Sequence, residues 1–111
     1  MQKGEIYLAN LNPTKGSEKA GQRPVVIVSG NLLNQYAPVV WVCPLSSSIK
    51  YYHGDLILRP NKTNGLKQKS EVLIMHLRSI SKGRLEKKLG QLSKSDLEEL
   101  RRGIKEVLVM D

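Results

Sequence analysis

A polar loop that leads directly into an apolar run constrains the fold of this chain more than any other feature. The loop covers residues 16–24 and contains two glycines, one acid, Glu18, and one arginine, Arg23. Pro24 fixes its own φ and holds Arg23 in an extended backbone conformation, which suits contact with an anion. The apolar run from Pro24 to Ser29 is typical of a short strand that is buried on both faces. The sequence therefore predicts a loop that carries functional side chains and is attached to a rigid strand.

The size and charge of the chain limit the kinds of partner that it binds. With 111 residues, of which 40% are apolar, the chain is long enough for one domain over residues 1–111. The 18 Lys and Arg residues against 10 Asp and Glu residues give a formal net charge of +8. This balance favours a polyanionic partner, with nucleic acid first, an acidic protein second and an anionic membrane surface third.

Cysteine use and apolar segments indicate a reducing compartment. Cys43 is the one cysteine of the sequence, so a disulfide within the chain and a zinc motif are both excluded, and a buried, inert thiol is expected. We expect no metal and no cofactor. The N-terminus lacks the apolar core of a signal peptide, and no apolar run approaches the length that spans a membrane. The expected location is the cytoplasm, without membrane attachment.

Short apolar or alternating runs separated by polar turns predict a mainly β fold. Strands are expected at residues 5–9, 24–29, 39–45, 55–58, 71–80 and 86–91, and one helical turn at residues 31–36. The segments between them, at residues 10–23, 46–52 and 59–69, are polar. Strands of this length and spacing are typical of a small antiparallel barrel.

The C-terminal segment has a different, helical pattern. Ser95 and Glu98 have the spacing of a capping box, and Asp96 adds negative charge to the first turn. Apolar residues then recur at helical spacing up to Val109. The sequence therefore predicts an amphipathic helix from Ser95 to Val109 that packs on the barrel.

Five blocks of sequence, spread over nearly the whole chain, carry a family resemblance. They are Gly4-Glu5-Ile6-Tyr7, Leu11-Asn12-Pro13-Thr14-Lys15-Gly16-Ser17-Glu18, Gly21-x-Arg23-Pro24-Val25-Val26-x-Val28-Ser29, Val42-Cys43-Pro44-Leu45-Ser46-Ser47 and Leu77-Arg78-Ser79-Ile80. In these blocks the chain resembles the MazF/PemK family of bacterial toxins. The resemblance implies an SH3-like barrel with a C-terminal helix, a homodimer, and a metal-independent, sequence-specific endoribonuclease that cleaves single-stranded RNA and inhibits translation and growth. It also implies a cognate antitoxin with an acidic, disordered C-terminal segment that blocks the RNA groove.

Metal-free RNA cleavage needs three kinds of group, and the chain offers a candidate for each. The neighbouring 2′-hydroxyl attacks the phosphate, so a base, an acid and a cation for the developing charge are required. Arg23 matches the arginine of the family motif and suits the last role. Glu18 matches the family acid, and serves either as the base or as a brace for the loop. Ser46 aligns with a Thr or Ser that donates to the phosphate, with a register uncertain by one residue, or it bonds its own turn.

A second set of residues is predicted to bind RNA. Tyr51 and Tyr52 follow Lys50, and aromatic side chains beside a cation are what single-strand binders use to stack bases. His53 is adjacent to them, although a surface histidine often has no such role. The complete predicted RNA-binding set is Lys19, Gln22, Ser47, Lys50, Tyr51, Tyr52, His53 and Arg78.

The chain departs from the family at Met75. Family members often carry an acid at this position and a glutamine at the next, where this chain has His76. The pKa of a histidine suits general catalysis at neutral pH. If residues 71–80 form a strand, however, alternation places His76 on the face opposite Met75, which favours a half-buried structural role. Catalysis then depends on Arg23, Glu18 and Ser46.

Two alternative functions follow from the same residues. The same barrel serves toxins that bind DNA gyrase without cleaving RNA, and the methionine at position 75 weakens the case for catalysis. The third possibility is a barrel that binds RNA and leaves it intact, which salt-sensitive binding without product would identify.

Overall fold

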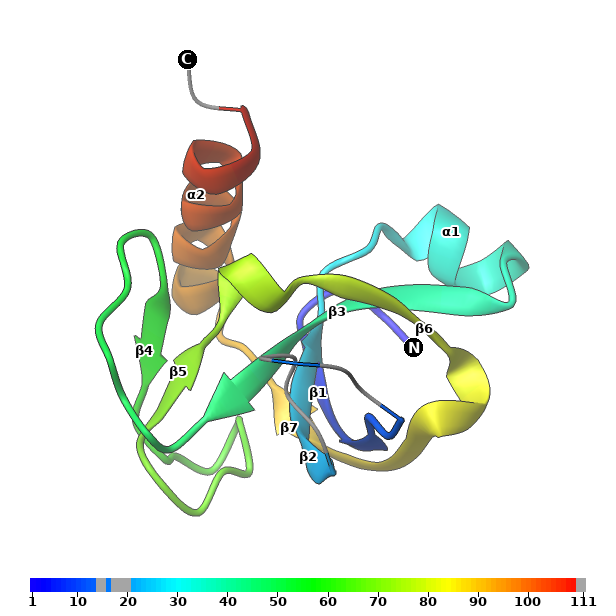
Figure 1. The fold of residues 1–111 in the computed structure, drawn as a ribbon, viewed down its shortest axis with the longest axis horizontal. Helices are drawn as coiled ribbons and strands as arrows, with labels where there is room; N and C mark the ends of the chain where they lie inside the picture. Colours follow the sequence, from blue (N-terminus) through cyan, green and yellow to red (C-terminus); the bar gives the residue numbers. More distant parts are fainter. Residues whose placement is uncertain (14–15, 17–20, 110–111) are drawn as a thin grey trace.

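The computed structural model describes residues 1–13, 16 and 21–109, and shows a curled antiparallel sheet with two helices (Figure 1). The strands are β1 (Glu5–Asn10), β2 (Gln22–Ile27), β3 (Val39–Ser46), β4 (Leu56–Leu58), β5 (Ser70–Val72), β6 (Arg78–Ser81) and β7 (Leu85–Gln91). The helices are α1 (Asn31–Tyr36) and α2 (Lys94–Val109), with short 3-10 turns η1 (Ile74–His76) and η2 (Lys82–Arg84). The prediction of a mainly β fold with a C-terminal helix is confirmed.

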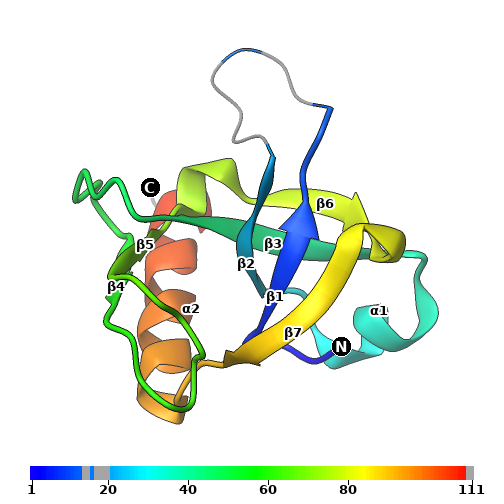
Figure 2. The ribbon, with the colours of Figure 1, turned by 90° about the horizontal axis from the view of Figure 1, so that it is seen from below.

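Strand β3 is the centre of the sheet. The strand order is β4-β5-β3-β2-β1-β7, and β6 also pairs with β3. All the pairs are antiparallel, so β3 pairs with β2, β5 and β6 along different parts of its length. Figure 2 shows β3 crossing behind β1 and β2, with β6 running beside it. The sheet therefore curls into part of a barrel. The antiparallel pairing of β2 with β3 places the N-terminal end of β2 beside the C-terminal end of β3.

Two apolar clusters lie on opposite faces of β2 and β3. Val25 and Ile27 belong to the smaller cluster, whereas Val26 belongs to the larger one. This division follows from the alternation of side chains along a strand. It also confirms that the strand after the first loop is buried on both faces, because all three of these side chains are fully buried.

Helix α2 packs on the larger cluster, beside β4 and η1 (Figure 1). It begins at Lys94, one residue earlier than predicted, and its cap is Ser93, whose Oγ accepts the Asp96 N–H at 3.1 Å. The predicted capping box at Ser95 is therefore wrong, because the chain already turns into the helix two residues before it. Gly103 brings the helix into close contact with the turn before β4, since a Cβ there would lie 2.1 Å from the Gly54 carbonyl oxygen.

The predicted strand at residues 71–80 is wrong in its middle. The segment contains β5, the turn η1 and then β6. The Leu73 N–H still donates to the Pro44 carbonyl of β3 at 2.9 Å, in register with the β3–β5 pairing. The next N–H, that of Ile74, donates instead to the Asp55 carboxylate at 3.0 Å, so the main chain leaves the β ladder here. The apolar residues of this segment are buried by tertiary contacts and not by a continuous strand, which the alternation pattern cannot distinguish.

The other predicted elements are confirmed with small changes at their ends. The predicted strands at residues 5–9, 24–29, 39–45, 55–58 and 86–91 correspond to β1, β2, β3, β4 and β7, and the helical turn at 31–36 is α1. No helix in the part of the chain that the structure describes has the length and apolar character needed to cross a membrane.

Candidate functional site

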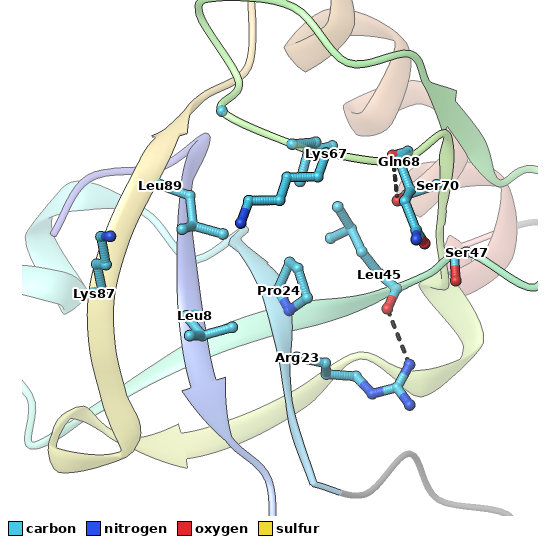
Figure 3. Close-up of a pocket in the computed structure, with 12 residues that line it drawn as sticks. Leu8, Arg23, Pro24, Leu45, Ser47, Lys67, Gln68, Ser70, Lys87 and Leu89 are labelled. Carbon is cyan, nitrogen blue, oxygen red and sulfur yellow. Dashed lines mark hydrogen bonds between the residues drawn. The ribbon is translucent and has the colours of Figure 1, made fainter.

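A cavity of about 530 Å³ lies beside the C-terminal end of β3, and β1, β2, β7 and the loop between β4 and β5 also contribute to its lining. It has an apolar base and a rim that includes Arg23, Lys67 and Lys87. In Figure 3 the Lys67 side chain extends across one end, and Arg23 and Ser47 lie at the other. The full lining comprises Leu8, Arg23, Pro24, Leu45, Ser47, Gly65, Leu66, Lys67, Gln68, Ser70, Lys87 and Leu89. Cations around an apolar base suit a phosphate with an attached base or sugar.

The loop between β4 and β5 forms one wall of this cavity, a role that the sequence did not reveal. Asn64 is buried and orders the loop, because its Oδ1 accepts the Asn61 and Leu66 N–H groups at 3.1 and 3.0 Å. Its Nδ2 donates to the Arg59 carbonyl at 2.9 Å. The Lys-, Asn- and Gly-rich composition of residues 59–69 was the signal available, but such composition is equally typical of an ordinary surface loop.

Arg23 lies on β2 at the edge of the cavity. It is half-buried and pairs with Ala9 of β1 in the ladder. Its Nη1 donates to the Leu45 carbonyl of β3 at 3.1 Å, a contact drawn in Figure 3. A guanidinium has five donors in a fixed, planar fork, whose shape and charge match the oxygens of a phosphate. The geometry therefore suits Arg23 to bind a phosphate at the cavity rim.

The serines at the end of β3 differ in accessibility: Ser46 has a structural role, whereas Ser47 is accessible. Ser46 is buried, and its Oγ accepts the Ser48 N–H at 3.1 Å. Ser47 is exposed and lines the cavity at the same end as Arg23 (Figure 3). Since the family alignment is uncertain by one residue here, Ser47 is better placed than Ser46 to meet a ligand in this conformation.

The loop after the serines presents the two predicted stacking residues. Tyr51 and Tyr52 are 67% and 44% exposed, so both rings are accessible. Lys69 Nζ lies 3.3 Å from the Tyr51 hydroxyl and 5.8 Å from the centre of its ring. His53 instead points to α2, where its Nε2 lies 3.4 Å from a Glu106 carboxylate oxygen.

Beneath this loop lies a pair of carboxyl groups, from the buried Glu71 and the half-buried Asp55, that the sequence did not single out. Glu71 is fully buried in β5, and Asp55 precedes β4. Burial, followed by a hydrogen bond to Glu71, raises the pKa of Asp55 to about 7. Burial alone would raise the pKa of Glu71, but Asp55 and three main-chain N–H groups outweigh it and hold that pKa below its ordinary value. The pair therefore shares a proton near neutral pH, with Asp55 as its carrier. An acid inside an otherwise apolar segment was the available signal.

The shared proton predicts how stability depends on pH. The folded chain keeps a proton on Asp55 between its ordinary pKa of 3.8 and about 7, whereas the unfolded chain has released it. We therefore expect the free energy of unfolding to receive a contribution that is complete below this window and is lost as pH rises through it. Glu71 acts with the opposite sign, because its stabilisation is present above its ordinary pKa of 4.5 and is lost on further acidification.

Asp55→Asn tests this expectation because the amide cannot titrate. Urea unfolding at about pH 5 and about pH 8 should show a smaller loss of stability on raising the pH in the variant than in the unmodified protein. Equal losses in both proteins would contradict the assignment of the proton to Asp55.

The remaining predicted site residues are not all brought together. Glu18 and Lys19 lie outside the residues that the structure describes. Gln22 donates its Nε2 to Glu86 at 2.5 Å. Arg78 is half-buried on β6, and its Nη1 is buried without a hydrogen-bond partner among the described residues. Neither Gln22 nor Arg78 lines the cavity.

Met75 and His76 lie on the η1 turn, so the prediction that placed them on a strand was wrong. Met75 is 58% exposed, and His76 is half-buried, as predicted, but for another reason. The turn directs successive side chains around its axis, whereas a strand would send them to opposite faces. Neither residue lines the cavity that contains Arg23.

The expected inert thiol is confirmed. Cys43 is fully buried in β3, and burial, with a smaller effect of the Asp55 charge, raises its pKa to about 12. A thiol with so high a pKa is not a nucleophile at neutral pH. Among residues 1–13, 16 and 21–109, no group of three or more His, Cys, Asp or Glu side chains is arranged to hold a metal ion.

Comparisons with known proteins identify the family and agree with the fold. The sequence model of the family described as "PemK-like, MazF-like toxin of type II toxin-antitoxin system" matches residues 2–108. Endoribonuclease MazF of Staphylococcus saprophyticus is 34% identical over 105 residues, covering 94% of this chain and 88% of that protein.

Two solved structures from Deinococcus radiodurans have the same fold. The crystal structure of MazF (Form-I) is 27% identical, with a TM-score of 0.83 over 97% of this chain and 96% of that one. A chain of the MazE-MazF crystal structure (Form-II) is 26% identical, with a TM-score of 0.77 over 100% and 97%. This chain belongs to the PemK-like, MazF-like toxin family of type II toxin–antitoxin systems.

Proposed function

We propose that this toxin is an endoribonuclease that cleaves single-stranded RNA, mRNA included, without a metal ion, and so inhibits translation and growth. The observation that carries the proposal is the position of Arg23 at the 530 Å³ cavity, which Ser47 and Lys67 also line (Figure 3). The curated relative is named an endoribonuclease, which favours cleavage over gyrase binding and over RNA binding without cleavage.

The reaction is a transesterification within the RNA chain. The 2′-hydroxyl oxygen forms a bond to the neighbouring phosphorus, its proton leaves to a base, and the bond to the 5′-oxygen breaks as that oxygen gains a proton. The products are a 2′,3′-cyclic phosphate and a 5′-hydroxyl end. Arg23 stabilises the charge that develops on the phosphorane oxygens. A serine hydroxyl, from Ser46 or Ser47, donates to a phosphate oxygen.

The identity of the base follows from the resemblance and not from a contact. Glu18 is the proposed base, because the loop that bears it ends at Gly21, directly before β2 and Arg23. Two hydrogen bonds hold the ends of that loop together. The Leu11 N–H donates to the Gly21 carbonyl, and the Gly21 N–H donates to Asn12 Oδ1, each at 3.0 Å. This closure ties the loop to the strand that presents Arg23.

The partners belong to the same proposal. We propose a single domain over residues 1–111, a homodimer in the cytoplasm, and a cognate antitoxin whose acidic, disordered segment competes with RNA for the basic cavity rim. The MazE-MazF complex with the same fold supports this assignment. An antitoxin that binds without displacing RNA would contradict the competition.

Cleavage in the presence of a chelator tests the proposed reaction. We expect the purified protein to cut single-stranded RNA in excess EDTA and to leave a 2′,3′-cyclic phosphate, because the side chains named above supply the charge stabilisation. A panel of RNAs of varied sequence, analysed by electrophoresis and mass spectrometry, measures this. A folded protein that leaves the whole panel intact would contradict it.

A further inference from the structure

We propose that Glu71 is a positioning residue for RNA binding, because it holds the loop at residues 50–52 in the shape that presents Tyr51 and Tyr52. This inference rests on the proposed function, in which these two rings stack on RNA bases. Glu71 is not among the residues that line the cavity with Arg23, so we do not propose it as a catalytic group. Its effect is transmitted through the main chain of the loop.

Three consecutive main-chain N–H groups converge on the Glu71 carboxylate. Oε1 accepts the Lys50 and Tyr51 N–H groups at 2.7 and 3.1 Å, and Oε2 accepts the Tyr52 N–H at 2.8 Å. Charge-assisted hydrogen bonds of this kind are stronger than those between neutral groups. The carboxylate is fully buried, so solvent does not compete for it. These contacts fix the orientation of three successive peptide groups.

The conformation that is held is one that the loop would not prefer by itself. Tyr51 has φ 57°, in the left-handed region that a tyrosine seldom adopts. A backbone in this region persists where surrounding contacts determine it. Here those contacts are hydrogen bonds to Glu71, which binds the N–H of Tyr51 and the N–H groups of both neighbouring residues. Release of the carboxylate would therefore let Tyr51 return to an ordinary conformation and move its ring.

Asp55 completes the arrangement from the other side. Its carboxyl lies against Glu71 and accepts the Ile74 N–H at 3.0 Å. A protonated Asp55 donates to Glu71, which keeps Glu71 ionised for the loop. The titratable groups that interact with Asp55 among the described residues are Glu71 itself and the Cys43 thiol, and Cys43 stays neutral.

The matched substitutions separate this role from simple packing. Glu71→Gln keeps the size of the side chain, but its amide NH₂ faces a main-chain donor. Asp55→Asn keeps the acceptor for the Ile74 N–H and keeps a donor for Glu71, so it mimics the protonated acid. Glu98→Gln is the control for loss of one carboxylate, because Glu98 lies on α2 with its side chain 61% exposed.

The first measurement is RNA binding by the full-length protein. With a single-stranded RNA made uncleavable by 2′-methoxy groups, we expect Glu71→Gln to raise Kd about tenfold, the scale of one lost base–aromatic stack. The control variant Glu98→Gln should stay near the unmodified Kd. On cleavable RNA, Glu71→Gln should raise KM more than it lowers kcat.

A double-mutant cycle tests whether Glu71 acts through the tyrosines. Glu71→Gln should weaken RNA binding less when it is added to Tyr52→Ala than when it is made in the unmodified protein.

The second measurement is independent of activity, and its titration part uses only the unmodified protein. In ¹⁵N spectra of the unmodified protein, the amide protons of Lys50, Tyr51 and Tyr52 should titrate together with the carboxyl pair, and they should shift upfield in Glu71→Gln. Unmodified Kd in a folded Glu71→Gln overturns the inference, as do three amides that do not titrate together. Failure of the unmodified protein to cleave RNA rejects the proposed reaction instead, and leaves the binding and amide results to decide the role of Glu71.

Discussion

Arg23→Ala should lower the rate of RNA cleavage about 10²–10³-fold, because this is the usual cost of removing one group that stabilises developing charge. Arg23 provides the guanidinium at the end of the cavity next to Ser47. Since its Nη1 also donates to the Leu45 carbonyl, the variant loses one hydrogen bond of the fold. Single-turnover cleavage of a short RNA measures the rate, and thermal unfolding shows whether the fold is retained.

Two further substitutions determine what Arg23 contributes. Arg102→Ala removes one positive charge from an exposed position of α2, and should leave the rate almost unchanged. Arg23→Lys keeps the charge but loses the planar fork, so we expect an intermediate rate. Full activity in a folded Arg23→Ala protein would refute the role of Arg23 as charge stabiliser.

Gly103→Ala should destabilise the protein, although alanine is the better helix former. A Cβ at position 103 would lie 2.1 Å from the Gly54 carbonyl oxygen and 2.8 Å from Ile74 Cδ1, so α2 has to move away from the sheet. Overpacking of this kind costs about 1–3 kcal/mol. For a chain of this size, that cost corresponds to a decrease in Tm of roughly 5–15 °C, measurable by calorimetry.

Gly83→Ala is the matched control for this substitution. Gly83 lies in the η2 turn, and a Cβ there would have no neighbouring atom within 4 Å. Its Tm should therefore stay close to that of the unmodified protein. An unchanged or higher Tm for Gly103→Ala would show that helix propensity outweighs the close contact with Gly54.

The strands of this protein can be predicted from sequence where local pattern and tertiary burial agree. Val25, Val26 and Ile27 form an apolar run and are buried on both faces. The pattern fails at Ile74, whose N–H is bound by Asp55, 19 residues earlier in the chain. It fails again at the start of α2, where Ser93 caps the helix before the predicted Ser95. In both cases a hydrogen bond from a main-chain N–H to a side chain marks the position where the backbone departs from the predicted path.

The candidate site is predictable to a similar extent. Arg23 was identified because a proline and a family motif fix its position in the sequence. Lys67 was missed because its place at the cavity depends on how Asn64 folds the β4–β5 loop. Glu71 was missed because its partners, Lys50, Tyr51 and Tyr52, lie on a separate loop. A residue whose partners are main-chain groups far away in the sequence cannot be identified from the residues next to it.

The central position of β3 has a consequence for how the toxin loses activity. Because β3 pairs with β2, β5 and β6, both apolar clusters depend on it. Neither half of the sheet has a separate core from which it can open alone, so unfolding is cooperative. The Leu45 carbonyl that contacts Arg23 belongs to the same strand. We therefore expect any opening of β3 to disturb both apolar clusters and the Arg23 contact together.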